Sequence, residues 1–146
     1  AVGLTPALEG YCREFSRRTQ LPIRFSAAGE TPPLPDLYNI TLYRFLQEAL
    51  ANVAKHARAS QVWVRLDVQE GGVRLSIRDD GAGFAQTLSG PVTTPINRPD
   101  GSAGMGILGM QERLGLLNGR LEINARPGEG SQVIGWLPIA AEGRHD

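Results

Sequence analysis

Four side chains able to bind a metal or a phosphate lie within one predicted helix: Glu48, Asn52, Lys55 and His56. At 100° per residue, these positions fall within a sector of about 100° on the helix surface. The apolar residues of the same segment centre on the other side of the helix. One helix would therefore carry a core stripe and a separate stripe of carboxylate, amide, ammonium and imidazole groups.

Each group of this polar stripe has a distinct use at a phosphate. Asn52 offers a neutral oxygen to a hard cation such as Mg²⁺, which keeps several waters and bridges to substrate phosphates. Lys55 supplies a point charge for a phosphate, and His56 can donate a hydrogen bond to one. Glu48 can position or polarise a nucleophile. The other interpretation is a plain solvated helix face, and the stripe alone leaves both open.

A second motif, Asp79-x-Gly81-x-Gly83, follows a predicted strand. Taken alone, an aspartate and two glycines at a strand end indicate a turn. The functional interpretation is that the carboxylate accepts a hydrogen bond from the exocyclic amine of adenine, while the glycines let the backbone approach the base. We expect the neighbouring Asp80 to be exposed to solvent.

The third motif runs from Gly104 to Gly109 and spells G-x-G-x-x-G. A dinucleotide-binding unit needs a strand directly before this pattern, whereas the residues before it are rich in proline and polar side chains. A glycine hinge followed by a helix N-terminus aimed at phosphates explains the motif better. Long segments with little periodicity are often lids, and we expect a lid over about residues 85–103.

The elements that must position these motifs alternate in type along the chain. Helical spacing and strand-like alternation follow one another, the helices over residues 4–19, 36–57 and 105–118, and the strands over 21–26, 61–68, 73–78, 120–125 and 131–137. Asp36 is the expected N-cap of the second helix. Neighbouring strands joined by tight turns predict an α+β fold of two layers, with helices on one face of a mixed, mostly antiparallel sheet.

Composition limits the number of domains and the class of partner. A chain of 146 residues fits a single domain, residues 1–146, with a frayed tail over about 140–146. The 15 basic and 15 acidic residues balance, which argues against a general nucleic-acid binder. The single cysteine, Cys12, excludes an internal disulfide framework and a multi-cysteine zinc site. No apolar run approaches the roughly 20 residues that span a bilayer.

Together, the three motifs resemble the N, G1 and G2 boxes of the GHKL superfamily, the ATP-binding fold of histidine kinases and type II topoisomerases. Ser131 stands where this family often has a threonine before its last strand. A closer resemblance is to histidine kinases of the nitrate/nitrite-sensor type and of the desaturase-controlling membrane-fluidity type. Two segments carry it, LYRFLQEALANVAKHARASQVWVRL and GMGILGMQERLGLLNGRLEI, and it covers about residues 3–139.

The resemblance implies a Bergerat-type α/β sandwich with an ATP lid, and ATP and Mg²⁺ as ligands. It leaves Glu48 a supporting catalytic role. The implied contacts to the nucleotide and its metal are Asn52 (Mg²⁺), Lys55 and His56 (phosphates), Asp79, Gly81 and Gly83 (adenine), Gly104, Gly106 and Ile107 (the end of the lid) and Ser131.

The function implied by this resemblance is that of the ATP-binding catalytic domain of a bacterial two-component sensor histidine kinase. The γ-phosphoryl group would pass to a histidine on a separate dimerisation domain, since neither His56 nor His145 has the context of a phosphoacceptor. The implied partners are that domain and, indirectly, a response regulator, within a homodimeric full-length protein. The resemblance also implies a cytoplasmic location, with a membrane-anchored sensor as one form of the longer protein.

Three alternatives share the fold and stay open on sequence alone. One is a stand-alone serine kinase of the anti-sigma type, and another is a GHKL ATPase in which Glu48 activates water. The third is a binding module without activity, against which the intact Asn52, Asp79 and glycines argue.

Overall fold

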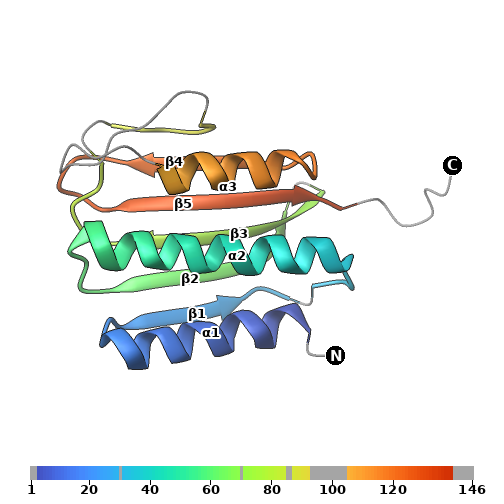
Figure 1. Cartoon of the computed structure of the whole chain (residues 1–146), viewed down its shortest axis with the longest axis horizontal. Helices are drawn as coiled ribbons and strands as arrows, with labels where there is room; N and C mark the ends of the chain where they lie inside the picture. The colour runs from blue at the N-terminus through green and yellow to red at the C-terminus, as the bar shows by residue number, and fades with distance from the viewer. Residues whose placement is uncertain (1–2, 30, 70, 85–86, 93–104, 140–146) are drawn as a thin grey trace, which may run out of the picture.

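The computed structural model describes residues 3–29, 31–69, 71–84, 87–92 and 105–139. Its elements, in chain order (Figure 1), are helix α1 (Leu4–Thr19), strand β1 (Ile23–Ala27), helix α2 (Asp36–Asn52), the π-helix η1 (Val53–Ala57), strands β2 (Val62–Gln69) and β3 (Gly72–Asp79), helix α3 (Met105–Gly115), and strands β4 (Arg120–Ala125) and β5 (Ser131–Pro138). The strands form one sheet in the order β1-β2-β3-β5-β4. Strand β1 pairs with β2 in parallel, and the other three pairings are antiparallel, which confirms the predicted mixed sheet.

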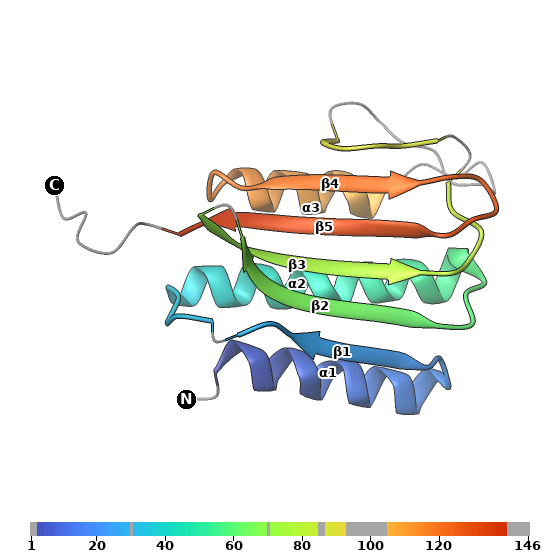
Figure 2. The ribbon, with the colours of Figure 1, turned by 180° about the vertical axis from the view of Figure 1, so that it is seen from behind.

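Among the described residues, the three α-helices lie on one face of this sheet, and the opposite face carries no helix (Figures 1 and 2). Strand alternation sends one set of side chains towards the helices, where Leu66, Leu75 and Ile77 pack with Leu46 and Leu50 of α2 in a continuous apolar core. This is the two-layer α+β arrangement predicted from the sequence. Within the described residues, no helix is both long and apolar enough to cross a membrane.

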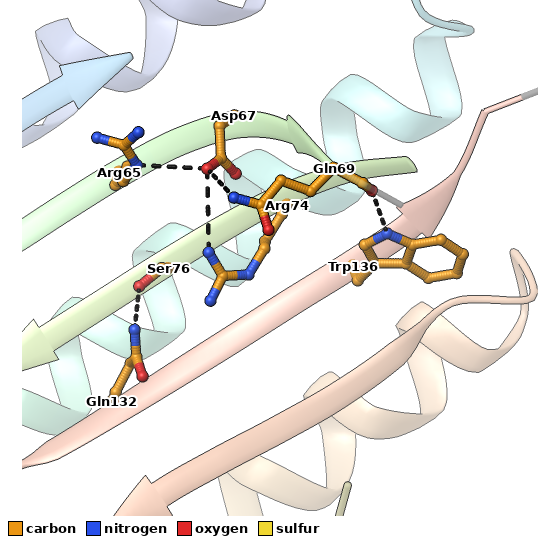
Figure 3. A network of polar contacts seen from close by, with 7 residues as sticks. All are labelled: Arg65, Asp67, Gln69, Arg74, Ser76, Gln132 and Trp136. Atoms are coloured by element: carbon orange, nitrogen blue, oxygen red, sulfur yellow. Dashed lines mark hydrogen bonds and ion pairs between the residues drawn. The ribbon is translucent and has the colours of Figure 1, made fainter. Parts of the chain in front are cut away.

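The helix-free face of the sheet is polar, which lets it remain in water. Asp67 accepts hydrogen bonds from Arg65 Nε (3.3 Å) and Gln69 Nε2 (2.9 Å), and Arg74 lies 3.9 Å away (Figure 3). Further contacts on this face pair Gln132 with Ser76 and stack two guanidinium groups on indole rings, Arg78 on Trp63 and Arg120 on Trp136. The stacking covers apolar ring surface that a second helical layer would otherwise have to bury.

Helix boundaries differ from the sequence prediction at three points. Asp36 is the first residue of α2 rather than its N-cap, a position that Pro35 occupies without a side-chain hydrogen bond. The helix expected to continue to residue 57 changes into η1 at Val53, because a π-turn depends on tertiary contacts that the 3.6-residue period does not encode. Helix α3 ends at Gly115, since the next turn tightens, with Leu117 N donating to Leu114 O.

Part of the segment expected to lack regular structure pairs with β4. Leu88 and Ala125 exchange both backbone hydrogen bonds, at 2.8 and 2.9 Å, and Val92 N donates to Leu121 O at 3.0 Å. The yellow stretch beside β4 in Figure 2 is this added edge. Within the expected lid, residues 88–92 therefore form backbone hydrogen bonds with β4. Residues 93–104 and the tail 140–146 lie outside the described residues, so a mobile lid stays a prediction.

The contact between Phe45 and the sheet gives a prediction about stability. Phe45 of α2 is 2% exposed, and its ring lies so close to Gly135 of β5 that an added Cβ there would come within 3.1 Å of it. We expect Phe45→Ala to lower the free energy of unfolding by about 3–5 kcal/mol, because it leaves a cavity between helix and sheet. Urea denaturation measures this, with Leu116→Ala as control. Leu116 is 83% exposed, so its truncation should cost less than about 0.5 kcal/mol. Similar losses in both variants would contradict the packing.

Candidate functional site

Asp79, at the end of β3, is a buried carboxylate held in one orientation. Its side chain accepts hydrogen bonds from Gly81 N on Oδ1 and from Ser131 Oγ on Oδ2, both at 2.8 Å, and the residue is 3% exposed. Burial raises the pKa of Asp79, and the hydrogen bonds from Ser131 and Gly81 offset part of that rise. The register of the sheet explains the pairing, since Asp79 lies directly opposite Ser131 on β5.

A small cavity of about 30 Å³ lies beside this carboxylate, between the sheet and the helices α2 and α3. Its walls are mostly apolar, with a few polar groups from separate elements. The lining residues are Ala49, Asn52, Val53, His56, Ala57, Ile77, Asp79, Gly83, Phe84, Ile107, Met110, Ser131 and Val133. An apolar slot with a few convergent polar groups is the usual form of a small-molecule site.

The glycines after β3 allow the turn to pack closely on both sides. A Cβ added at Gly81 would lie 2.1 Å from the carbonyl oxygen of Ala57 in η1. One added at Gly83, which has a φ of +73°, would lie 2.4 Å from the carbonyl oxygen of Arg126. The structure therefore gives both glycines a packing role that the sequence did not suggest. Gly83 lines the cavity and Gly81 does not, and their contact with a base stays a prediction.

The start of α3 lies against the polar stripe of α2. A Cβ added at Gly106 would be 2.7 Å from Glu48 Oε2 and 3.5 Å from Asn52 Nδ2. The N-terminus of a helix presents free backbone N–H groups and a partial positive charge, both of which favour anions. The structure thus brings one carboxylate, one amide and the start of α3 together, and Asn52 of this group also lines the cavity.

The remaining residues of the predicted site differ in whether they line the cavity. Ile107 is buried in the wall of the cavity and His56 also lines it. Lys55, in the same turn of η1, is exposed. Gly104 lies outside the described residues.

Two cavity residues that the sequence reasoning missed have a recognisable signal. Met110 follows Ile107 by three positions and so faces the same way on α3. Phe84 directly follows the second motif and is 5% exposed, so a large apolar residue next to the glycines was the available clue. Both contribute apolar surface to the cavity that Asp79 and Ser131 also line.

A ready-made metal cluster is not part of this site. Within the described ranges, no group of three or more His, Cys, Asp or Glu side chains could hold a metal ion. Glu48 and Asn52 of α2 are oxygen-bearing side chains that lie close to Gly106 at the start of α3.

A mixed sheet with helices on one face, and a slot between the two layers, agrees with the two-layer α/β sandwich that the sequence resemblance implies. Residues 38–141 match the family described as histidine kinase-, DNA gyrase B- and HSP90-like ATPase. The chain belongs to this family, which confirms the resemblance found in the sequence motifs.

Two relatives of this chain are a signal transduction histidine-protein kinase/phosphatase and a nitrate/nitrite sensor protein. The chain is 36% identical over 141 residues to the signal transduction histidine-protein kinase/phosphatase DegS of Brevibacillus brevis, covering 97% of this chain and 34% of that protein. It is 29% identical over 134 residues to the nitrate/nitrite sensor protein NarX of Escherichia coli K12, covering 90% and 20%. The chain therefore spans at most about a third of these two relatives.

A solved structure shows the same fold. The blue-light activated histidine kinase of Erythrobacter litoralis EL346 superposes with a TM-score of 0.73 at 20% identity, covering 97% of this chain and 43% of that one.

Proposed function

We propose that this chain is the ATP-binding catalytic domain of a bacterial sensor histidine kinase. It would bind ATP with Mg²⁺ and present the γ-phosphoryl group to a histidine on a separate dimerisation domain. The observation that carries the proposal is the buried carboxylate of Asp79, fixed by Gly81 and Ser131 in the wall of an apolar slot, in a chain of this ATPase family.

Asp79 would recognise the adenine base. The lone pairs that Gly81 and Ser131 leave free can accept a hydrogen bond from the exocyclic amine, while Ile107, Met110 and Phe84 offer apolar contact to the ring. A cavity of about 30 Å³ is far below the roughly 300 Å³ of typical ligand sites. Base binding would therefore require the wall from α3 to move away from the sheet.

The other end of the slot would hold the phosphates and the metal. Asn52 offers a neutral oxygen to Mg²⁺, and the backbone at Gly106 would face the phosphate oxygens from the start of α3. Lys55 and His56 would add donors from η1. Mg²⁺ prefers oxygen ligands and keeps several waters when it bridges to phosphates, so a site with few protein ligands suits it. A bound Mg²⁺ would supply neutralisation of the phosphate charge.

Phosphoryl transfer would then depend on a second domain. This chain would position the nucleotide and neutralise charge, the base for the accepting histidine would come from the dimerisation domain, and Glu48 would keep a supporting role. The full-length protein would be a homodimer that passes the phosphoryl group to a response regulator. This domain would lie in the cytoplasm and would not bind nucleic acid. A membrane-anchored sensor is one form that the full-length protein could take.

A chimeric kinase tests this function. Replacing the matching catalytic region of DegS from B. brevis with this chain, which is 36% identical to it, should give acid-labile phosphohistidine from γ-labelled ATP. This chain alone should give none, because it lacks an acceptor. Label on serine, or phosphate released steadily by the chain alone, would favour the serine kinase or the ATPase. A chimera that binds ATP without any transfer would contradict the proposal.

The assignment of Asn52 to the metal gives a further prediction. Asn52→Asp should change the Mg²⁺ dependence of ATP binding and leave the affinity for adenosine within about twofold, since the new charge meets the metal and phosphates and not the base. Titration calorimetry with both ligands measures this. Gln47→Glu is the matched control, because it makes the same amide-to-carboxylate change at another position of α2 that does not line the cavity. Equal effects of Asn52→Asp on the affinities for ATP and adenosine would contradict the assignment of Asn52 as a metal ligand.

A further inference from the structure

Asp80, next to the adenine-site carboxylate, binds a different part of the chain. Its side chain accepts hydrogen bonds from Ser60 N (2.8 Å), Ser60 Oγ (2.6 Å) and Gln61 N (3.1 Å). The hydrogen bond from the Ser60 hydroxyl, with the backbone bonds, lowers the pKa of Asp80. The residue is exposed, as expected from the sequence, but it is tied to the segment that leaves η1.

That segment reverses the chain within a few residues. Arg58 ends η1 in the left-handed conformation, with a φ of 55°, and β2 begins at Val62. Just before the reversal, Ala57 O accepts a hydrogen bond from Ala82 N at 2.6 Å. The turn after β3 therefore binds the chain on both sides of Arg58. Ala82 binds the last residue of η1, and Asp80 binds the segment that follows η1.

These two attachments matter because η1 is a π-helix. A π-helix is rare, is mostly a single turn within an α-helix and is frequent at functional sites, so tertiary contacts must maintain it. Lys55 and His56 both lie in η1, and His56 lines the cavity. A return of this turn to α geometry would rotate both side chains relative to Asn52, which belongs to the regular part of α2.

We propose that Asp80 is a positioning residue, which keeps Lys55 and His56 at the phosphate end of the site by anchoring the chain that leaves η1. Asp79 and Asp80 then serve the two ends of one nucleotide, the first by contact with the base and the second through η1. The inference rests on the proposed function, since it concerns how the phosphates are bound.

Comparing the affinities for Mg²⁺-ATP and for adenosine distinguishes this positioning role from a general loss of structure at the site. We expect Asp80→Ala to weaken ATP binding roughly tenfold and to change adenosine binding less than about twofold, because the contacts of Asp79 remain. Asp80→Asn keeps an acceptor for the backbone N–H groups and should retain most of the ATP affinity. Glu9→Ala, which removes an exposed carboxylate from α1, is the control for loss of charge.

A second readout does not depend on nucleotide. In NMR spectra without ligand, Asp80→Ala should shift the amide signals of residues 53–57 and leave those of Ser131 and Val133 in place. If Asp80→Ala fails to fold, Ser60→Ala removes one of the three hydrogen bonds and should show the same pattern, more weakly.

Two results would overturn the positioning role. One is a folded Asp80→Ala variant with unchanged ATP affinity, and the other is a proportional loss of ATP and adenosine affinity. Failure of the wild-type protein to bind either ligand would instead overturn the proposed function, which is a separate and distinguishable outcome.

Discussion

Asp79→Asn should abolish adenine-nucleotide binding, with the affinity for ADP lowered at least about 100-fold. In the wild type, both carboxylate oxygens are acceptors, one facing Gly81 N and the other Ser131 Oγ. Asparagine can keep its oxygen on Gly81 N, but its NH₂ group then replaces the second acceptor. That group would face the amine of adenine, and two donors cannot form a hydrogen bond.

The same substitution should leave the protein folded, for an electrostatic reason. Burial raises the pKa of Asp79 above its ordinary value of 3.8, so the folded state binds this proton more tightly than the unfolded state. Stability therefore falls as pH rises through the interval between the two pKa values, and the cost is fully present above the raised one. A neutral asparagine carries no such cost. We expect Asp79→Asn to gain stability relative to the wild type at about pH 7 and to lose that gain as the pH approaches about 4.

Calorimetric titration of ADP and thermal unfolding across this pH range measure both halves of the prediction. Asp67→Asn is the matched control, because Asp67 is also 3% exposed but lies on the helix-free face of the sheet, away from the cavity. Its nucleotide affinity should not change. Full affinity for ADP in a folded Asp79→Asn variant would contradict the assignment of Asp79 to adenine.

Gly81→Ala should damage stability and binding together. The added Cβ would lie 2.1 Å from the carbonyl oxygen of Ala57 and 2.9 Å from its Cβ, and no side-chain rotation relieves a clash with backbone. The turn would have to move away from η1 and break the hydrogen bond from Ala82 N to Ala57 O. We expect a loss of about 3 kcal/mol or more in the free energy of unfolding, and nucleotide binding lost with it.

Gly10→Ala is the control for this change. Gly10 lies within α1, and an added Cβ there meets nothing within 4 Å. Alanine should stabilise the helix by up to about 1 kcal/mol. Urea denaturation compares the two variants, and similar stabilities would contradict the close packing of the turn on η1.

Local patterns predicted the regular elements well. The helix expected over residues 4–19 and the strand expected over 120–125 occur as α1 and β4 with the same bounds, because burial on one face imposes a period that the sequence carries. The pairing of residues 88–92 with β4 left no such trace. It depends on contacts such as Gly90 N donating to Asn124 Oδ1 and Gln111 Nε2 donating to Val92 O, which only the tertiary arrangement creates.

The candidate site was likewise predictable from the sequence only in part. The residue types at positions 48, 52 and 79 indicated chemistry from the sequence, and the structure brings Asn52 and Asp79 to one cavity. The strand register that sets Ser131 opposite Asp79 joins residues 52 positions apart, and a pattern within either strand does not contain it. The anchor from Asp80 to Ser60 was also missed, since an exposed carboxylate beside a glycine turn looks like ordinary solvated surface.

The most direct measurement is a crystal structure with a non-hydrolysable ATP analogue and Mg²⁺. We predict the exocyclic amine of adenine at hydrogen-bonding distance, about 2.7–3.2 Å, from the Asp79 carboxylate, and the phosphates beside Asn52 at the start of α3. A second hollow, of about 400 Å³, also borders Asp79 and is lined by Arg78, Thr87, Ser89 and Arg126 among others. An analogue bound there, with the slot under α3 closed, would contradict the account.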